Sequence, residues 1–85
     1  MWTKSWQNKR PGWTRRVRWF PQKNGNIRLE FVEREADQPD GRRSKHSVTV
    51  NPEMAEKIWA LYCHDHLDHM TGRDIFFAVK EEQEG

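Results

Sequence analysis

The stretch WTRRVRWFPQKNGNIRLEF, residues 13–31, decides the fold because two alternating segments flank one turn signal within it. In the first segment, Val17 and Trp19 share one parity, while Arg16 and Arg18 share the other. Successive side chains of a strand point to opposite faces of a sheet, so this alternation predicts a half-buried strand.

The second half of the stretch predicts a β-hairpin. Asn24-Gly25 favours a tight turn because both residues tolerate a positive φ. Ile27, Leu29 and Phe31 follow and alternate with charged residues, which is typical of a second strand.

A third strand is expected after a loop. Residues 35–44 contain an Asp-Gly turn signal and read as a loop. His46, Val48 and Val50 then alternate with small polar residues. This pattern predicts one more strand beside the hairpin.

A helix is predicted to begin at Asn51-Pro52-Glu53. Asparagine is a favoured N-cap, proline fits the first helical position, and an acidic residue suits the positive end of the helix dipole. One apolar stripe at about 100° per residue contains Met54, Ile58, Leu61 and Tyr62. We expect this helix to run to about Met70 and to lie across the sheet.

The two ends of the chain carry weaker patterns. The first residues show no sustained period and end in Pro-Gly, which favours a flexible arm. Residues 73–82 alternate like a strand, whereas Thr71 with Asp74 is typical of a helix start. The predicted organisation is a basic and aromatic arm at 1–12, one domain at 13–80 and an acidic tail at 81–85.

The predicted fold class is therefore α+β. It comprises a small antiparallel three-stranded sheet, made of the hairpin and the third strand, packed by one amphipathic helix. A short C-terminal helix or strand completes the domain, and the sequence leaves both alternatives open.

The composition fits one small domain and excludes several classes of protein. The chain has 85 residues, of which 33% are charged and five are Trp, so a thin core must depend on aromatic side chains. No phosphate loop, nucleophile elbow or zinc knuckle is present, and we expect neither enzymatic activity nor a cofactor. The apolar runs are far shorter than the roughly 20 residues of a membrane span. A single cysteine, Cys63, suits a reducing compartment, so we expect a cytoplasmic protein without membrane contact.

The charges are divided unevenly along the chain. Residues 1–28 hold eight basic residues and no acidic residue. The whole chain has a net charge of +2, so residues 29–85 carry −6. Such asymmetry is typical of a protein whose basic part meets a polyanion.

Aromatic residues are interleaved with these basic residues. Cations can follow a phosphate backbone while aromatic rings stack on unpaired bases, which favours single-stranded nucleic acid. The residues predicted to bind it are Lys4, Trp6, Lys9, Arg10, Arg15, Arg16, Arg18, Trp19 and Arg28. The predicted function is that of a small nucleic-acid-binding accessory or regulatory protein.

Two other interpretations of this basic and aromatic segment stay open. The tryptophans can be core residues above a solvated sheet face whose arginines are balanced by Glu30, Glu33 and Glu35. Alternatively, Trp and Arg can serve as interface residues of a protein-binding module or inhibitor of viral or mobile-element type. A homodimer formed through an exposed strand edge is compatible with each alternative.

Residues 63–69, CHDHLDH, form a histidine cluster. His64, His66, Asp68 and His69 fit the pattern H-x-H-x-D-H, which resembles the zinc-binding signature of the metallo-β-lactamase fold hydrolases. The resemblance implies a much larger two-sheet fold and further metal ligands downstream. No His or Cys follows His69, so we expect no zinc hydrolase.

A smaller metal site is the remote alternative for the same cluster. Asp65 and His69 lie four residues apart, and His66 lies within one turn of His69, with His46 as a fourth ligand from elsewhere. The same residues equally form ordinary helix-surface pairs near a helix end, and we therefore assign no metal ligand.

Overall fold

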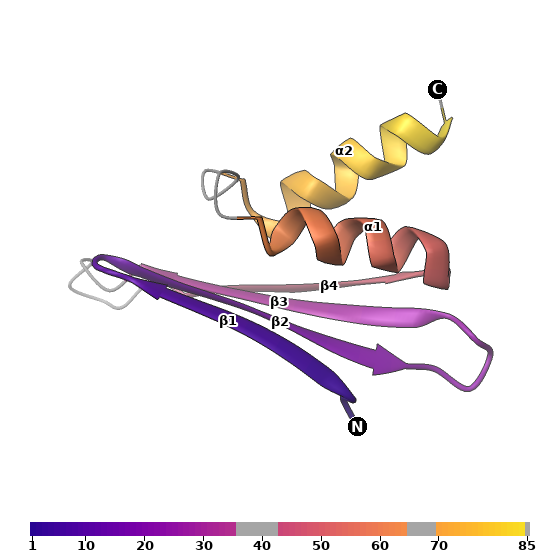
Figure 1. The fold of residues 1–85 in the computed structure, drawn as a ribbon, viewed down its shortest axis with the longest axis horizontal. Helices are drawn as coiled ribbons and strands as arrows, with labels where there is room; N and C mark the ends of the chain where they lie inside the picture. The colour runs from indigo at the N-terminus through magenta and orange to yellow at the C-terminus, as the bar shows by residue number, and fades with distance from the viewer. Residues whose placement is uncertain (36–42, 65–69, 85) are drawn as a thin grey trace.

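The computed structural model describes residues 1–35, 43–64 and 70–84. The elements are β1 (Lys4–Arg10), β2 (Trp13–Pro21), β3 (Ile27–Glu35), β4 (Arg43–Val50), α1 (Pro52–Tyr62) and α2 (Gly72–Glu84). The four strands form one antiparallel sheet in the order β1-β2-β3-β4, and both helices lie on the same side of it (Figure 1). The α+β class is confirmed, with four strands in the sheet.

The prediction of a three-stranded sheet is wrong by one strand. Residues 4–10, which the sequence placed in a flexible arm, form β1 and pair with β2 at every position. Pro11-Gly12 is the two-residue turn between these strands, and Gly12 has a φ of 92°. Proline followed by glycine suits a tight turn whose second central residue needs a positive φ. The pattern missed β1 because Trp6 is its one large apolar side chain.

The predicted hairpin between β2 and β3 is confirmed. Gly25 has a φ of 90°, and the Gln22 amide donates a 2.8 Å hydrogen bond to the Asn26 carbonyl. The Asn24 carboxamide oxygen accepts a 3.0 Å hydrogen bond from the Asn26 amide, so the turn is closed by its own polar groups.

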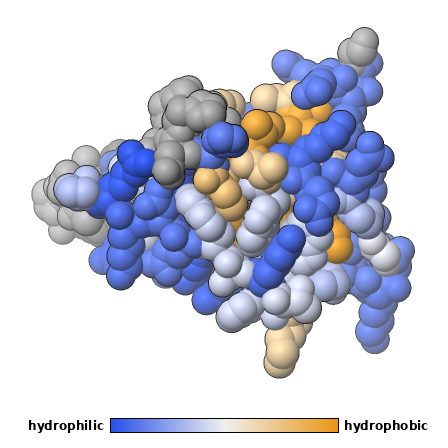
Figure 2. Space-filling model, in the orientation of Figure 1, coloured by the Kyte–Doolittle hydropathy of each residue, from blue (hydrophilic) through white to orange (hydrophobic). Residues whose placement is uncertain are grey.

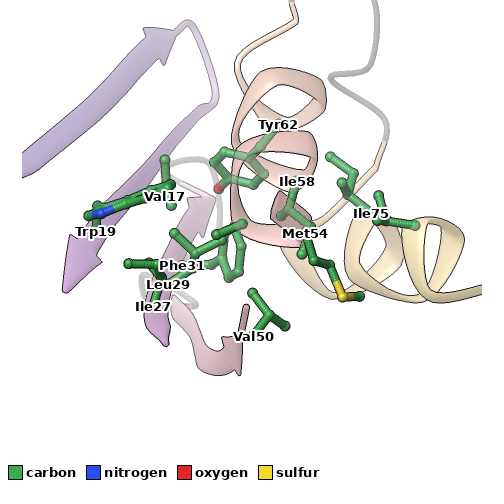
Figure 3. Close-up of a cluster of buried hydrophobic side chains, with 12 residues drawn as sticks. Val17, Trp19, Ile27, Leu29, Phe31, Val50, Met54, Ile58, Tyr62 and Ile75 are labelled. Carbon is green, nitrogen blue, oxygen red and sulfur yellow. The ribbon is translucent and has the colours of Figure 1, made fainter. Parts of the chain in front are cut away.

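The core lies between the sheet and α1, with α2 completing it (Figure 3). Its buried members are Val17, Trp19, Ile27, Leu29, Phe31, Val50, Met54, Ala55, Ile58, Tyr62, Ile75 and Val79. Aromatic rings join the layers: the centroids of Phe31 and Tyr62 are 4.9 Å apart, and those of Trp19 and Trp59 are 5.8 Å apart. These contacts supply apolar area that a short chain with few aliphatic residues otherwise lacks.

Helix α1 begins as predicted and ends earlier than predicted. Asn51 is the N-cap, and its side chain accepts a 2.8 Å hydrogen bond from the Met54 amide. The helix ends at Tyr62, so its expected extension to about Met70 is wrong. Tyr62 is the last residue of the core-facing stripe, and the sequence offers polar residues at the next stripe positions. A longer helix would therefore present no apolar side chain to the sheet along this stripe.

The C-terminal element is a helix, and of the two alternatives the strand is wrong. The Asp74 amide donates to the Thr71 hydroxyl over 3.1 Å, and the Thr71 amide donates to the Asp74 carboxylate over 3.0 Å. This reciprocal capping box outweighs the strand-like alternation. Ile75 and Val79, four residues apart, are the buried face of α2. The helix continues to Glu84 and so includes most of the predicted acidic tail.

Candidate nucleic-acid interface

The sheet has two faces of different character. One face packs on the helices, and in the described part of the chain both helices lie on that side (Figure 1). We call the other side the open face. It consists of Ser5, Gln7 and Lys9 of β1; Thr14, Arg16, Arg18 and Phe20 of β2; Arg28, Glu30, Val32 and Arg34 of β3; and Arg43, Lys45, Ser47 and Thr49 of β4. These residues share one parity in the strand register, so their side chains leave the sheet on the same side.

The open face is strongly basic. It carries seven basic side chains and one acidic side chain, Glu30, which is only 12% exposed and lies 3.6 Å from Arg28. The sequence also offered Glu33 and Glu35 as counter-charges for the arginines of this face. Both residues have the opposite parity and lie on the helix side. In α1 and α2, six acidic residues outnumber three basic ones. The molecule is therefore positive on its open face and negative on its helices.

The residues of the open face form rows across the strands. One row runs Lys9, Thr14, Arg34, Arg43, and the next runs Gln7, Arg16, Val32, Lys45. A hollow of about 330 Å³ is lined by Gln7, Lys9, Thr14, Arg16, Val32, Arg34 and Arg43. Four of the seven lining residues are basic and none is acidic, so the hollow is suited to an anion.

Aromatic side chains stand at the opposite end of the open face. The Arg28 guanidinium lies 4.0 Å from the centre of the Phe20 ring, and that of Arg18 lies 5.4 Å from the Trp2 ring. Trp2 is 43% exposed. Stacked guanidinium and aromatic groups offer flat surfaces on which an unpaired base can stack.

The structure divides the predicted binding residues between the two faces. Four lie together on the open face: Lys9, Arg16, Arg18 and Arg28. Five have the parity of the helix side: Lys4, Trp6, Arg10, Arg15 and Trp19. The division follows from strand parity, which a charge count along the chain does not resolve.

The helix-side residues near α1 are engaged in packing. The Lys4 ammonium lies 4.0 Å from the Trp19 ring centre and 4.7 Å from that of Trp59, and it reaches Glu56 at 3.8 Å. Trp6 packs edge-on against Tyr62 at a centroid distance of 5.9 Å.

Arg15 belongs to a buried polar network beneath the end of α1. Its side chain is 1% exposed, its guanidinium lies 4.0 Å from the centre of the Tyr62 ring, and it donates to the Met70 carbonyl. Tyr62 donates a 3.0 Å hydrogen bond to Glu33, whose same oxygen accepts from the Gly72 amide at 2.9 Å. Burial and the Glu33 carboxylate raise the pKa of the Tyr62 phenol, which therefore stays protonated. The network joins β2, β3, α1 and the start of α2.

Three basic residues of the open face were missed by the sequence prediction, namely Arg34, Arg43 and Lys45. The prediction followed the basic N-terminal segment and stopped at Arg28. Extending the alternation of β3 beyond Phe31 would have found Arg34 on the face of Arg28. The two β4 residues needed the pairing of β3 with β4, which places them beside Arg34 and Val32.

The histidine cluster lies mostly outside the described residues, because Asp65, His66, Asp68 and His69 fall in 65–69. Within residues 1–35, 43–64 and 70–84, no group of three or more His, Cys, Asp or Glu side chains could hold a metal ion. His46 stacks on Phe31 at a centroid distance of 5.2 Å.

Cys63 lacks the features of an activated nucleophile. Burial raises the pKa of its thiol to about 11, against a normal value of 9.0. A reactive cysteine requires the opposite shift, because the thiolate is the nucleophile.

No protein-family model, curated protein or solved structure matches this chain. Neither helix of the described chain is long and apolar enough to cross a membrane. In the view of Figure 2, much of the apolar surface lies over α1 and α2, and a separate apolar group projects at the lower edge, away from the helices.

Proposed function

We propose that this protein binds nucleic acid, preferably single-stranded, through the open face of its sheet. One observation carries the proposal: seven basic side chains and a single acidic one share a sheet face on the side away from both helices. Phosphate contacts by such groups release condensed counterions and supply most of the affinity of non-specific nucleic-acid binding.

The arrangement of charge would orient the protein as it approaches a nucleic-acid strand. The open face is positive and the helices are negative, so a polyanion is attracted to one side of the molecule and repelled from the other. Neighbouring strands lie about 4.8 Å apart, and residues two apart along a strand lie roughly 6.7 Å apart. The basic groups therefore form a two-dimensional array on which a flexible phosphate backbone can settle.

The preference for a single strand rests on the aromatic end of the open face. Trp2 and Phe20 stand there beside Arg18 and Arg28. A duplex keeps its bases stacked on one another, whereas a single strand can place a base on an exposed ring.

Fluorescence anisotropy tests the proposal directly. Labelled single-stranded and duplex oligonucleotides are titrated with the protein across a salt series, and we expect micromolar or tighter single-strand binding at low salt with a steep salt dependence. Arg16→Ala should weaken binding of all sequences similarly, whereas Lys57→Ala, an equal loss of charge on exposed α1, should not. No binding at low salt would overturn the proposal and favour a protein partner.

A further inference from the structure

The hollow on the open face lies at the end of the sheet opposite Trp2 and Phe20. It is lined by Lys9, Arg16, Arg34 and Arg43, together with Gln7, Thr14 and Val32. We infer that this hollow is a phosphate subsite that binds adjacent phosphate groups of a nucleic-acid strand. The inference rests on the proposed function and deepens it by separating phosphate binding from base stacking.

The strand register places like charges in direct opposition at this site. Arg34 pairs with Arg43 across β3 and β4, and Lys9 occupies the same row on β1. Like charges directly opposite each other in a sheet are destabilising. Neither this row nor the next, which contains Arg16, includes an acidic residue. An anion seated between these cations removes the repulsion that the unliganded sheet carries.

The chemistry of the hollow matches a phosphate group. Guanidinium groups offer paired N–H donors that fit phosphate oxygens, and Arg16, Arg34 and Arg43 supply three of them. Gln7 and Thr14 add neutral hydrogen-bond donors at the same site. Val32, which is 9% exposed, provides an apolar base that strengthens the surrounding electrostatic interactions.

The size of the hollow fits more than one phosphate. Its volume is about 330 Å³, at the lower end of the range for small-ligand sites. Lys9 and Arg43 are separated by three strand spacings, which corresponds to roughly 14 Å between their Cα atoms. A linear anion with several phosphate groups can therefore contact basic residues from all four strands.

Two probes separate the subsite from the whole interface. Isothermal titration calorimetry with inorganic tripolyphosphate tests the hollow alone. Fluorescence anisotropy with a labelled oligothymidylate of 20 nucleotides tests the complete open face. The variant is Arg34→Thr with Arg43→Thr, because threonine keeps the strand preference. The matched control is Lys57→Ala with Lys80→Ala, which removes the same charge from exposed positions of α1 and α2.

We expect saturable tripolyphosphate binding by the wild type and the control, and its loss in the Arg34 and Arg43 double variant. The oligothymidylate affinity of that variant should fall about tenfold, and its salt slope should decrease by about 1.4, corresponding to two phosphate contacts. Its melting temperature without ligand should equal or exceed that of the wild type, because the like-charge pair is gone. A melting temperature in this range would show that unfolding does not cause the loss of binding.

The outcomes distinguish the two proposals. Oligothymidylate binding with equal affinities for the double variant and the control would overturn the subsite while leaving the proposed function intact. Tripolyphosphate binding without oligonucleotide binding would show that the hollow binds phosphate, but it would overturn both the proposed function and the assignment of the hollow to a nucleic-acid strand. Absence of tripolyphosphate binding by the wild type would overturn the subsite. If the protein binds phosphatidylserine vesicles more tightly than oligothymidylate, the assignment of the hollow to nucleic acid is overturned.

Discussion

The Tyr62 hydroxyl donates a 3.0 Å hydrogen bond to Glu33 and so ties the last residue of α1 to strand β3. The same carboxylate oxygen accepts from the Gly72 amide at 2.9 Å, so one side chain organises both helix ends that meet there. Arg15 lies against the Tyr62 ring in the same network. A buried network of this kind is stabilising only while all of its members are present.

Tyr62→Phe is expected to lower the free energy of unfolding by about 1.5 kcal/mol, because it removes a hydrogen bond to a charged group and keeps the ring in place. Urea denaturation followed by tryptophan fluorescence measures the change. In a double-mutant cycle with Glu33→Gln, the two substitutions should be coupled, since they share one hydrogen bond. Strict additivity of the two effects would contradict the network.

Cys63 should be alkylated slowly by iodoacetamide. Its pKa is raised by burial to about 11 from 9.0, so at neutral pH the thiolate fraction is about a hundredfold below that of an unperturbed thiol. Because the folded pKa lies above the unfolded one, the associated stability is complete below pH 9 and is lost as the pH rises towards 11. Alkylation rates measured across pH 7 to 10, with the urea-unfolded protein as reference, test the raised pKa of the Cys63 thiol. Equal rates for both states would refute it.

Gly72→Ala tests the close approach of α2 to the sheet. A Cβ atom at this position would lie 2.3 Å from ring carbons of Phe31, which is buried and cannot move freely. We expect a loss of about 2 to 3 kcal/mol in the free energy of unfolding, as for other overpacked cores. The pair Gly72→Ala with Phe31→Leu should be less unstable than the sum of the single variants. Thermal unfolding of Gly72→Ala, Phe31→Leu and the double variant measures whether the two substitutions are coupled.

The sequence predicted those parts of the fold in which local chemistry and core packing agree. Asn24-Gly25 closes the hairpin by its own backbone preference, and Asn51 caps α1 by its own side chain. Strand β1 has no such signal, because an edge strand with one tryptophan shows too little alternation. The end of α1 depends on where the sheet stops supporting it, which is a tertiary property.

The sequence also predicted only part of the candidate interface. Arg16, Arg18 and Arg28 share the outer face of one hairpin, so parity within the hairpin was sufficient to group them. Arg43 joins them only through the pairing of β3 with β4, and the sequence pattern alone does not give the register of these two strands. Lys4 carries a charge that counts towards the basic segment, yet its side chain packs over Trp19 on the helix side.

Phe20→Ala separates stacking from charge on the open face. If Phe20 stacks on a base, its loss should reduce oligothymidylate affinity by roughly 1 to 2 kcal/mol, or about tenfold, while duplex affinity and the salt slope stay unchanged. The control is Phe77→Ala, because Phe77 is an exposed phenylalanine on α2, on the opposite side of the molecule. Anisotropy with both oligonucleotides gives the comparison. Equal losses for single strand and duplex would mean that Phe20 only positions Arg28, whose guanidinium lies 4.0 Å from the ring centre.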